Sequence, residues 1–536
     1  MTPRRQLIIL LLFLAGAFCV FSNILTSYFL SDDFVQIGKV LNGDFSVVWG
    51  KEHGGFFRPL FILSYIVDAK IWGARPFGFH LTNVAFHSFN AFLVFALSLR
   101  LMEALKLSMF ARQTISIAAG ALFLLHPSHT EAVSWISGRA DLLAMCFSLA
   151  SLLAYLNYSR RQRNSRLLIA LSCFALALLA KESAISVPFF VLLIGLFTNQ
   201  IHREKKTSRR FLISLALYFS ILLIFIAVRS AFLGALVGGY GPGQHLNFSP
   251  SWLRDRLLEA SLRSILPPLP DQMSLYLFKP LQSTVFILSS LICAALVIAV
   301  VFLRRRWLEY YQRREENRFL LVLVLLFLLS LLPVINLRLS LYEPSGERFL
   351  YMPTAFSCLL LVYLTTIVLR KPALWISILI CFVGLYAICT YRTNQLWREA
   401  ATLSRRIVVE LPASIRGDRL LIVNAPDNLR GVPVFHNGLS EALLYFQNQK
   451  GVSETAIVAF QRLESVDDRV IVNRRPGSVT IQLMNSRSGF SRVVSVECLY
   501  PVFQSKTVLE FGTRPCLNEK DVFFFDQGRM TTVLER

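Results

Sequence analysis

Two adjacent carboxylates, Asp32 and Asp33, follow the first apolar stretch of the 536-residue chain. A carboxylate within hydrogen-bond reach of a hydroxyl can act as a general base, and its neighbour can shape the electrostatic field around it. Adjacent aspartates also commonly cap the start of a helix or occupy a solvated turn. The pair by itself therefore indicates either a base or a structural cap.

A denser group of polar residues lies between two later apolar runs. From His126 to Asp141 the chain holds two histidines, a glutamate, an arginine and an aspartate. Polar groups at membrane depth are costly and tend to mark function, although an interfacial loop that reaches water would share this composition. His126, His129 and Glu131 could bind a divalent metal, but their spacing matches no standard zinc pattern. We interpret the segment as a candidate site and leave its metal dependence open.

Further polar residues occur at the ends of other apolar runs. His80, Asn83 and His87 recur at i, i+3 and i+7, so they share one helix face, which could equally be a packed, hydrogen-bonded helix contact. The others are Arg58, Arg139, Lys181, Glu182, Glu347 and Arg348. Fixed cations around an acidic base suit a reaction in which a hydroxyl attacks and a phosphate leaves.

Membrane helices are the elements that would position these residues. Hydrophobic residues make up 54% of the chain and charged residues 16%, whereas a soluble globular protein is about one quarter charged. Disordered, collagen-like, coiled-coil and cytosolic chains are therefore excluded. In a soluble protein the net charge of +22 would suggest nucleic acid, but these charges lie in loops between apolar runs. We therefore expect a lipid bilayer as partner and no nucleic acid.

Eleven apolar runs predict membrane helices, because about 20 such residues span the hydrocarbon and the backbone must hydrogen-bond internally. The first run follows two arginines, as a signal peptide would, but no A-x-A-like cleavage site follows it, so we expect it to be retained. The third, fifth and sixth runs are short and could break at their polar outer ends. The runs are 6–27, 79–101, 114–127, 141–158, 167–181, 184–199, 211–231, 284–303, 319–337, 351–369 and 373–391.

The basic loops predict the orientation of the chain. Every second short loop is basic, as at 160–166 and 203–210, and the intervening ones hold few cations. The positive-inside rule then places the N-terminus in the cytoplasm and the C-terminus outside. We expect a transmembrane domain over 1–391 and an extracytoplasmic α+β domain over 392–536.

The outer segments have their own patterns. The two outer loops are expected at 28–78 and 232–283, the second with an amphipathic stretch at 252–258 suited to the membrane interface. In the C-terminal domain the patterns predict strands and one helix. Strands are expected at 419–426, 470–472, 479–484 and 492–499, and the helix at 438–446.

Two cysteines stand apart from the rest. Seven of the nine cysteines lie in apolar runs, where they act as small hydrophobic residues. Cys498 and Cys516 lie in the outer domain, and an oxidising compartment favours a disulfide between them.

Several of these motifs occur in a fixed order along residues 1–370. They are Asp32-Asp33, Phe57-Arg58-Pro59-Leu60, His80-Leu81-x-Asn83, His126-Pro-x-His129-Thr-Glu131-Ala-Val, Gly138-Arg139-Ala-Asp141, Lys181-Glu182 and Glu347-Arg348-x-Leu-Tyr351-x-Pro. At these motifs the chain resembles the membrane half of the transmembrane and tetratricopeptide-repeat-containing O-mannosyltransferases. These belong with the polyprenyl-phosphate-dependent GT-C glycosyltransferases. The C-terminal domain departs from that family, because no 34-residue helical repeat is visible in it.

The resemblance implies a GT-C-like fold and a function. Such enzymes transfer a sugar, here a mannose-like hexose, from a polyprenyl phosphate to a hydroxyl of a protein, glycan or lipid, with inversion. It implies that Asp32 or Asp33 is the base. The sugar donor's phosphate would meet Arg139, Lys181 and Arg348, supported by Arg58, His80, Asn83, His126, His129, Glu131, Asp141, Glu182 and Glu347. The expected location is the inner (plasma) membrane of a bacterium, and no cofactor beyond a conceivable divalent metal is expected.

Two other classes of protein share part of the pattern. A transporter or flippase for lipid-linked sugars would also carry intramembrane charges, but no inverted repeat with paired broken helices is visible. A non-catalytic scaffold that presents the C-terminal domain would not require the aspartates and the cations to converge. The proximity of these groups therefore separates the enzyme from the scaffold.

Overall fold

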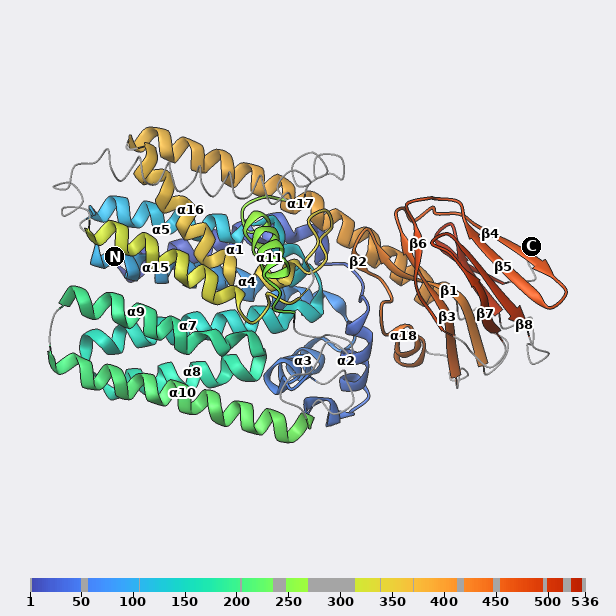
Figure 1. The fold of residues 1–536 in the computed structure, drawn as a ribbon, viewed down its shortest axis with the longest axis horizontal. Coiled ribbons are helices and arrows are strands. Elements are labelled where there is room, and N and C mark those ends of the chain that lie inside the picture. Colours follow the sequence, from blue (N-terminus) through green and yellow to red (C-terminus); the bar gives the residue numbers. More distant parts are fainter. Residues whose placement is uncertain are drawn as a thin grey trace.

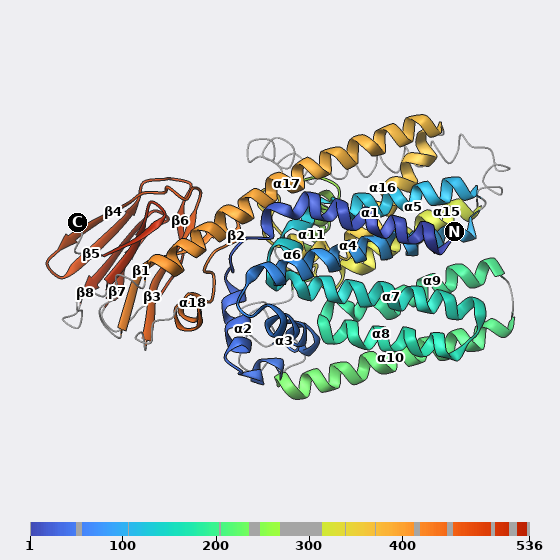
Figure 2. The same cartoon turned by 180° about the vertical axis from the view of Figure 1, so that it is seen from behind.

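The protein consists of a long bundle of helices and a domain of β-strands at one end of it (Figures 1 and 2). The computed structural model describes residues 2–49, 56–105, 107–202, 205–234, 247–268, 314–337, 339–369, 371–411, 419–446, 454–494, 499–513 and 522–532.

Every expected apolar run within the described residues is helical, and the run at 284–303 lies outside them. Five described helices are long and apolar enough to cross a membrane, and six if one bent pair counts as a single span. The chain is therefore a multi-pass membrane protein, whereas the count of eleven spans stays a prediction. The long helices are α1 (Pro3–Phe21), α4 (Pro76–Leu101), α5 (Met109–Leu124), α7 (Arg139–Arg161), α8 (Asn164–Ala180), α9 (Val187–His202), α10 (Lys205–Leu233), α15 (Arg314–Leu331), α16 (Pro353–Leu369) and α17 (Pro372–Glu410).

Local sequence explains where several of these helices begin and break. Proline stands in the first turn of α1, α4 and α17, where its missing N–H has no helical partner to lose. Pro127 lies three residues after the end of α5, and the helix pair Met109–Leu124 and Pro127–Ser134 bends at this break by 50°. The short third run thus breaks at its polar outer end, as expected.

Short helices gather at the end of the bundle that faces the strand domain. Among them, α2 and α3 lie beside that domain in both side views (Figures 1 and 2). The amphipathic stretch at 252–258 is helical as part of α11, while its place in the membrane interface stays a prediction. Their bounds are α2 (Asp32–Leu41), η2 (Phe45–Trp49), α3 (Pro59–Trp72), η4 (Pro127–His129), α6 (Thr130–Ser134), η5 (Ile136–Gly138), η6 (Glu182–Ser186), α11 (Pro250–Arg263) and η7 (Glu347–Leu350).

Where it is described, the strand domain contains two sheets and one short helix, so the expected α+β character is confirmed. One sheet has the order β10-β9-β1-β3-β6, with β2 beside β1, and the other has the order β4-β5-β8-β7. β1 runs parallel to both β3 and β9. The elements are β1 (Arg419–Leu429), β2 (Val432–Pro433), α18 (Leu439–Tyr445), β3 (Glu454–Leu463), β4 (Val470–Arg475), β5 (Ser478–Leu483), β6 (Gly489–Val493), β7 (Leu499–Gln504), β8 (Val508–Thr513), β9 (Val522–Asp526) and β10 (Arg529–Thr532).

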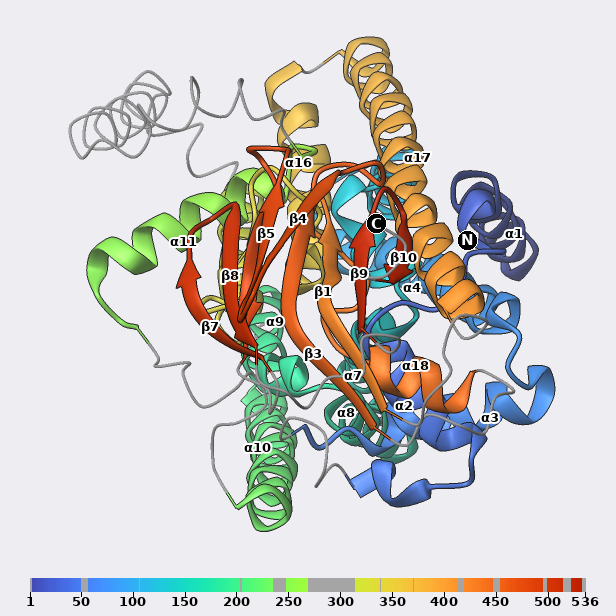
Figure 3. The ribbon, with the colours of Figure 1, turned by 90° about the vertical axis from the view of Figure 1, so that its right-hand side faces the viewer.

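One helix joins the two parts of the molecule. α17 continues through residue 391, the expected domain boundary, and ends at Glu410. Viewed from the strand domain, the sheets lie in front of the end of the bundle (Figure 3). Cys498 and Cys516 lie outside the described residues, so their disulfide stays a prediction.

Candidate functional site

The two adjacent aspartates at the start of α2 have different surroundings. Asp33 is buried, and its carboxylate accepts hydrogen bonds from the backbone N–H of Leu30 at 3.1 Å and of Ser137 at 2.9 Å. The Ser137 hydroxyl donates a third bond to it at 2.5 Å. Asp32 is partly exposed and accepts one hydrogen bond, from the Asn437 side chain at 2.9 Å. A structural role and an accessible carboxylate thus belong to different members of the pair, and neither side chain caps α2.

Burial also changes the acidity of the inner aspartate. Removal of the carboxylate from water is the largest effect and raises the pKa of Asp33 to about 7, although the Ser137 hydroxyl and the Leu30 N–H oppose the shift. The same hydrogen bonds of Asp33 to Leu30 and Ser137 fix the turn that carries Asp32 and tie this turn to η5.

The strand domain holds the same turn from the other side. Ser31 has a φ of +49°, a conformation that costs free energy in a residue with a Cβ and often occurs at functional sites. Its N–H donates to the Val434 carbonyl at 2.9 Å, and its hydroxyl accepts from the Asn437 N–H at 3.2 Å. The Phe34 ring stacks on Phe435 with centroids 5.9 Å apart. The position of Asp32 therefore depends on both domains.

A tryptophan lies between the aspartate turn and one of the predicted cations. The Trp135 indole N–H donates to the Leu30 carbonyl at 3.2 Å, and the Arg348 guanidinium lies 4.7 Å above the Trp135 ring. Arg348 also pairs with Glu131 at 2.8 Å. Arg348 is thus separated from the aspartate turn by one side chain.

Two further ion pairs extend this group. Lys181 contacts both carboxylate oxygens of Asp141 at 2.6 Å and follows α8 in an extended conformation. Arg58 pairs with Glu182 at 2.5 Å. Glu131 interacts electrostatically with Lys181 and Asp141 as well as with Arg348. The acids and cations predicted from different outer turns therefore converge.

Arg139 differs from the other predicted cations because its side chain is fully buried. It pairs with Asp68 at 2.6 Å, and its Nε donates to the Asn83 Oδ1 at 2.7 Å. Asn83 in turn donates to three carbonyls of the outer turn, those of Val133, Trp135 and Ile136. This geometry favours a role of Arg139 in holding the turn over the predicted contact with phosphate.

The predicted histidines are also buried and lie deeper than the ion pairs. His126 contacts the Ser264 carbonyl at 3.1 Å, and His129 contacts the Thr354 hydroxyl at 2.6 Å. His80 is buried on the same face of α4 as Asn83. Within the described residues, no group of three or more His, Cys, Asp or Glu side chains could hold a metal ion. The suggested metal set of His126, His129 and Glu131 is therefore wrong.

Glu347 and Arg348 are adjacent in sequence but pair with different residues. It is fully buried and pairs with Arg263 at the end of α11. The ion pair attaches the amphipathic helix to η7, which holds Arg348 in place. Glu347 is thus a supporting residue whose partner comes from the second outer loop.

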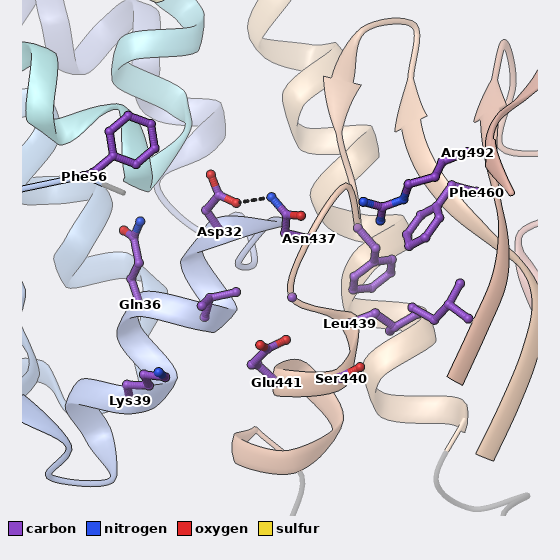
Figure 4. A pocket seen from close by; sticks show the side chains of 14 residues that line it. Asp32, Gln36, Lys39, Phe56, Asn437, Leu439, Ser440, Glu441, Phe460 and Arg492 are labelled. Atoms are coloured by element: carbon purple, nitrogen blue, oxygen red, sulfur yellow. Dashed lines mark hydrogen bonds between the residues drawn. The ribbon is translucent and has the colours of Figure 1, made fainter. Parts of the chain in front are cut away.

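A cleft opens between α2 and the strand domain, and Asp32 lies on its wall (Figure 4). Its volume is about 610 Å³. The Phe56 ring lies on its edge, with the Arg58 guanidinium 4.0 Å above it. The lining residues are Asp32, Val35, Gln36, Lys39, Phe56, Phe435, Asn437, Gly438, Leu439, Ser440, Glu441, Ile457, Phe460 and Arg492.

Sequence reasoning missed several residues that build this site. Asp68 lies in the segment that was expected to be the first outer loop, where a single acid gives no signal of its own. Trp135 and Ser137 lie between two selected motifs and carried no signal of their own. Asn437 is 405 residues away from its partner Asp32, so no local pattern could have indicated the contact.

Fold and site together define a multi-pass membrane protein with an aspartate, a cleft and an ion-pair group at one end of its helical bundle. No family model matches the chain. Over 203 residues it is 36% identical to protein O-mannosyl-transferase Tmtc1 of Drosophila melanogaster. This match covers 34% of this chain and 22% of the relative. Over 173 residues it is 32% identical to protein O-mannosyl-transferase TMTC4 of Homo sapiens, covering 28% and 23%. The resemblance stated from the motifs is thus confirmed, although the match spans under a quarter of each relative.

Two solved structures align with most of the chain. Both are ArnT from Cupriavidus metallidurans, one in the apo state and one bound to undecaprenyl phosphate. The apo structure has a TM-score of 0.35 at 16% identity, covering 83% of this chain and 85% of that one. The bound structure has a TM-score of 0.37 at 14% identity, covering 94% and 98%. TM-scores this low do not define a common fold.

Proposed function

We propose that this protein is a membrane glycosyltransferase that moves a mannose-like hexose from a polyprenyl phosphate to a hydroxyl acceptor outside the cytoplasm. The observation that carries the proposal is that Trp135 joins Arg348 to the turn that precedes Asp32, while Asp32 itself lines a cleft large enough for a substrate. Similarity to proteins named protein O-mannosyl-transferase supports the class of sugar and makes a protein hydroxyl the preferred acceptor.

Asp32 is the base in this proposal, and Asp33 is the positioning residue. A general base must come within hydrogen-bond distance of the proton that it takes, and Asp32 is the aspartate of the pair that lines the cleft. Both oxygens of Asp33 already accept hydrogen bonds inside the protein.

Arg348 is the main contact for the phosphate of the sugar donor. Its side chain is 23% exposed, compared with 3% for Lys181 and 0% for Arg139. The Phe349 ring lies 5.0 Å from the Arg348 guanidinium and 5.4 Å from the Lys181 ammonium. Phe349 also lines a small crevice of about 20 Å³ with Leu331 and Ile335.

The reaction balances with these groups alone. The acceptor oxygen forms a bond to the anomeric carbon while the bond from that carbon to the phosphate oxygen breaks. The hydroxyl proton passes to Asp32, and polyprenyl phosphate leaves with its electron pair beside Arg348. Attack from the face opposite to the leaving group inverts the anomeric centre, through an oxocarbenium-like transition state as in glycoside hydrolysis.

Transfer in membranes tests the proposal. Membranes that contain the chain are incubated with radiolabelled polyprenyl-phosphate mannose, and the label is followed into the water-soluble and protein fractions. Matched membranes without the chain are the control. We expect transfer that depends on the chain. Equal labelling with and without it would contradict the proposal and favour a scaffold.

A further inference from the structure

We propose that the cleft between α2 and the strand domain binds an extended polypeptide whose Ser or Thr hydroxyl is the acceptor. The strand domain is then the acceptor-binding part of the protein. This inference rests on the proposed function, because it takes Asp32 as the base.

The two domains build opposite walls of the cleft. Asp32, Gln36 and Lys39 recur at i, i+4 and i+7, so they lie on one face of α2, and Figure 4 shows this face opposite the strand domain. The other wall consists of the start of α18 with the loop before it, together with parts of β3 and β6. Because neither wall encloses the space alone, the cleft exists only when the domains are docked.

The docking is close enough to fix the width of the cleft. A Cβ at Gly438 would come within 2.4 Å of the Ser31 carbonyl oxygen, and one at Gly38 would come within 2.5 Å of the Tyr445 ring. The Phe446 ring contacts both Phe29 and Phe34, with centroids 5.0 and 5.2 Å away. The two domains therefore pack tightly along one side of the cleft, and two glycines allow this close approach.

The chemistry of the lining fits a polypeptide. Gln36 and Asn437 present amide groups that can both donate to a peptide carbonyl and accept from a peptide N–H. Lys39 and Glu441 add one charge of each sign. Six of the fourteen lining residues are apolar, among them Phe435, Phe460 and Ile457, and these can take apolar side chains that a saccharide does not have. The volume of about 610 Å³ falls within the range of about 300–1,000 Å³ typical of ligand pockets.

The sheet offers a second means of binding an extended segment. β6 is the last strand of its sheet within the described residues, where it pairs with β3 and the Phe490 N–H at its start also donates to the Lys506 carbonyl at 3.1 Å. Edge strands can bind an extended peptide as an added strand. Arg492 belongs to β6 and lines the cleft, with its guanidinium 3.9 Å above the Phe460 ring. A segment that passes along β6 would therefore reach the cleft and Asp32.

Filling the cleft tests this inference. Ser440→Trp places a large side chain in the cleft. Leu444→Trp introduces the same side chain on the same helix, at an exposed residue outside the lining. The full-length variants are assayed with radiolabelled polyprenyl-phosphate mannose and a mixture of synthetic Ser- and Thr-containing decapeptides. The KM for the peptides is measured, and so is release of the sugar to water without peptide, which reports on the site for the sugar donor.

We expect Ser440→Trp to raise the peptide KM at least about tenfold while release of sugar to water is unchanged, and Leu444→Trp to behave as wild type. If Ser440→Trp fails to fold, Arg492→Glu with Arg487→Glu as its control replaces it. A peptide KM within about twofold of wild type for the cleft variant would overturn the inference. Transfer to a free oligosaccharide but not to peptides would overturn the polypeptide occupant and leave the transferase standing. A wild-type chain that transfers sugar to no acceptor would instead overturn the proposed function itself.

Discussion

At the scale of single residues, the two adjacent aspartates divide two roles between them. Asp32 lines the cleft, and Asp33 holds the turn through Leu30 and Ser137. From the sequence, either aspartate could be the base or the structural residue, because the two have the same type and the same neighbours. The buried contact of Asp33 with Ser137, 104 residues away, decides the matter.

We predict that Asp32→Asn lowers transfer roughly 10²–10⁴-fold, which is the usual contribution of a general base. Asparagine is close in shape but has little basicity, so the contact with Asn437 and the fold should survive. The rate is measured with saturating sugar donor, and thermal unfolding in detergent checks the fold. Asp44→Asn, just beyond the end of α2, should keep the wild-type rate. Near-normal transfer by Asp32→Asn would show that the base is another group.

Arg348→Met should weaken binding of the sugar donor as well as turnover. The phosphate is charged before the reaction starts, so a cation that contacts it acts in both the ground state and the transition state. We expect the KM for the polyprenyl-phosphate sugar to rise and kcat to fall, with partial recovery in Arg348→Lys. Arg254→Met, which removes an arginine paired with Asp255 on α11, is the matched control. An unchanged KM for the sugar donor would remove Arg348 from the phosphate site.

The raised pKa of Asp33 predicts how stability depends on pH. Folding raises this pKa from 3.8 to about 7, so the folded state holds the proton more tightly than the unfolded state. The contribution of Asp33 to stability should therefore be fully present below about pH 4 and be lost as the pH rises through 7. Thermal unfolding between pH 4 and 8 should show this slope, with a smaller slope in Asp33→Asn. The exposed Asp467→Asn is the control, and an equal slope in Asp33→Asn would refute the assignment.

At the scale of elements, the apolar runs were predictable because membrane helices follow from local composition alone. Each run within the described residues is mainly helical, and β1, β4, β5 and α18 lie at their expected places. The strand expected at 492–499 was wrong in its bounds, because β6 ends at Val493 and β7 begins at Leu499, and β3, β8, β9 and β10 were not expected. α17 was expected to end at 391, but it continues to Glu410. Composition changes where a helix leaves the hydrocarbon, whereas the helix itself continues as long as its buried face packs, as Trp397 and Ile407 do here.

Contacts between distant elements were not predictable from sequence. The ion pair of Arg139 with Asp68 and the contact of Asn437 with Asp32 both join residues from separate elements. Pairing at such separations depends on the packing of whole helices, which residue types and spacing do not encode locally. The predicted site was therefore correct in its converging motifs and incomplete in their partners.

The docking of the strand domain on α2 makes a prediction about Gly438. Its φ is +87°, and an added Cβ would meet the Ser31 carbonyl oxygen at 2.4 Å. Gly438→Ala should therefore separate the domains and abolish transfer. Gly477→Ala carries the same penalty for a positive φ of +80° but meets nothing within 4 Å, so it isolates the cost of backbone strain. Accessibility of the interface to limited proteolysis measures docking, and equal behaviour of the two variants would contradict the prediction.

At the scale of the whole molecule, the basic loops and the candidate site lie at opposite ends of the bundle. The N-terminus, the end of α9 and the start of α10 lie at the end away from the strand domain (Figure 1). Basic loops meet at that end, where Arg160 pairs with Glu103 and Arg210 donates to Gln162 at 2.9 Å. α7 has 23 residues and so is about 35 Å long at 1.5 Å per residue, enough to cross the hydrocarbon.

This polarity predicts that the strand domain and the cleft lie outside the cytoplasm. Cations are retained on the cytoplasmic side of membrane proteins, and a polyprenyl-phosphate sugar on the outer leaflet would then meet Arg348 from the outer end. In a cysteine-free background, a membrane-impermeant thiol reagent added to intact cells should label Arg487→Cys in the strand domain but not Arg161→Cys at the end of α7. Permeabilised cells, in which both should be labelled, are the control. Labelling of Arg161→Cys alone in intact cells would invert the topology and place the proposed transfer on the cytoplasmic side.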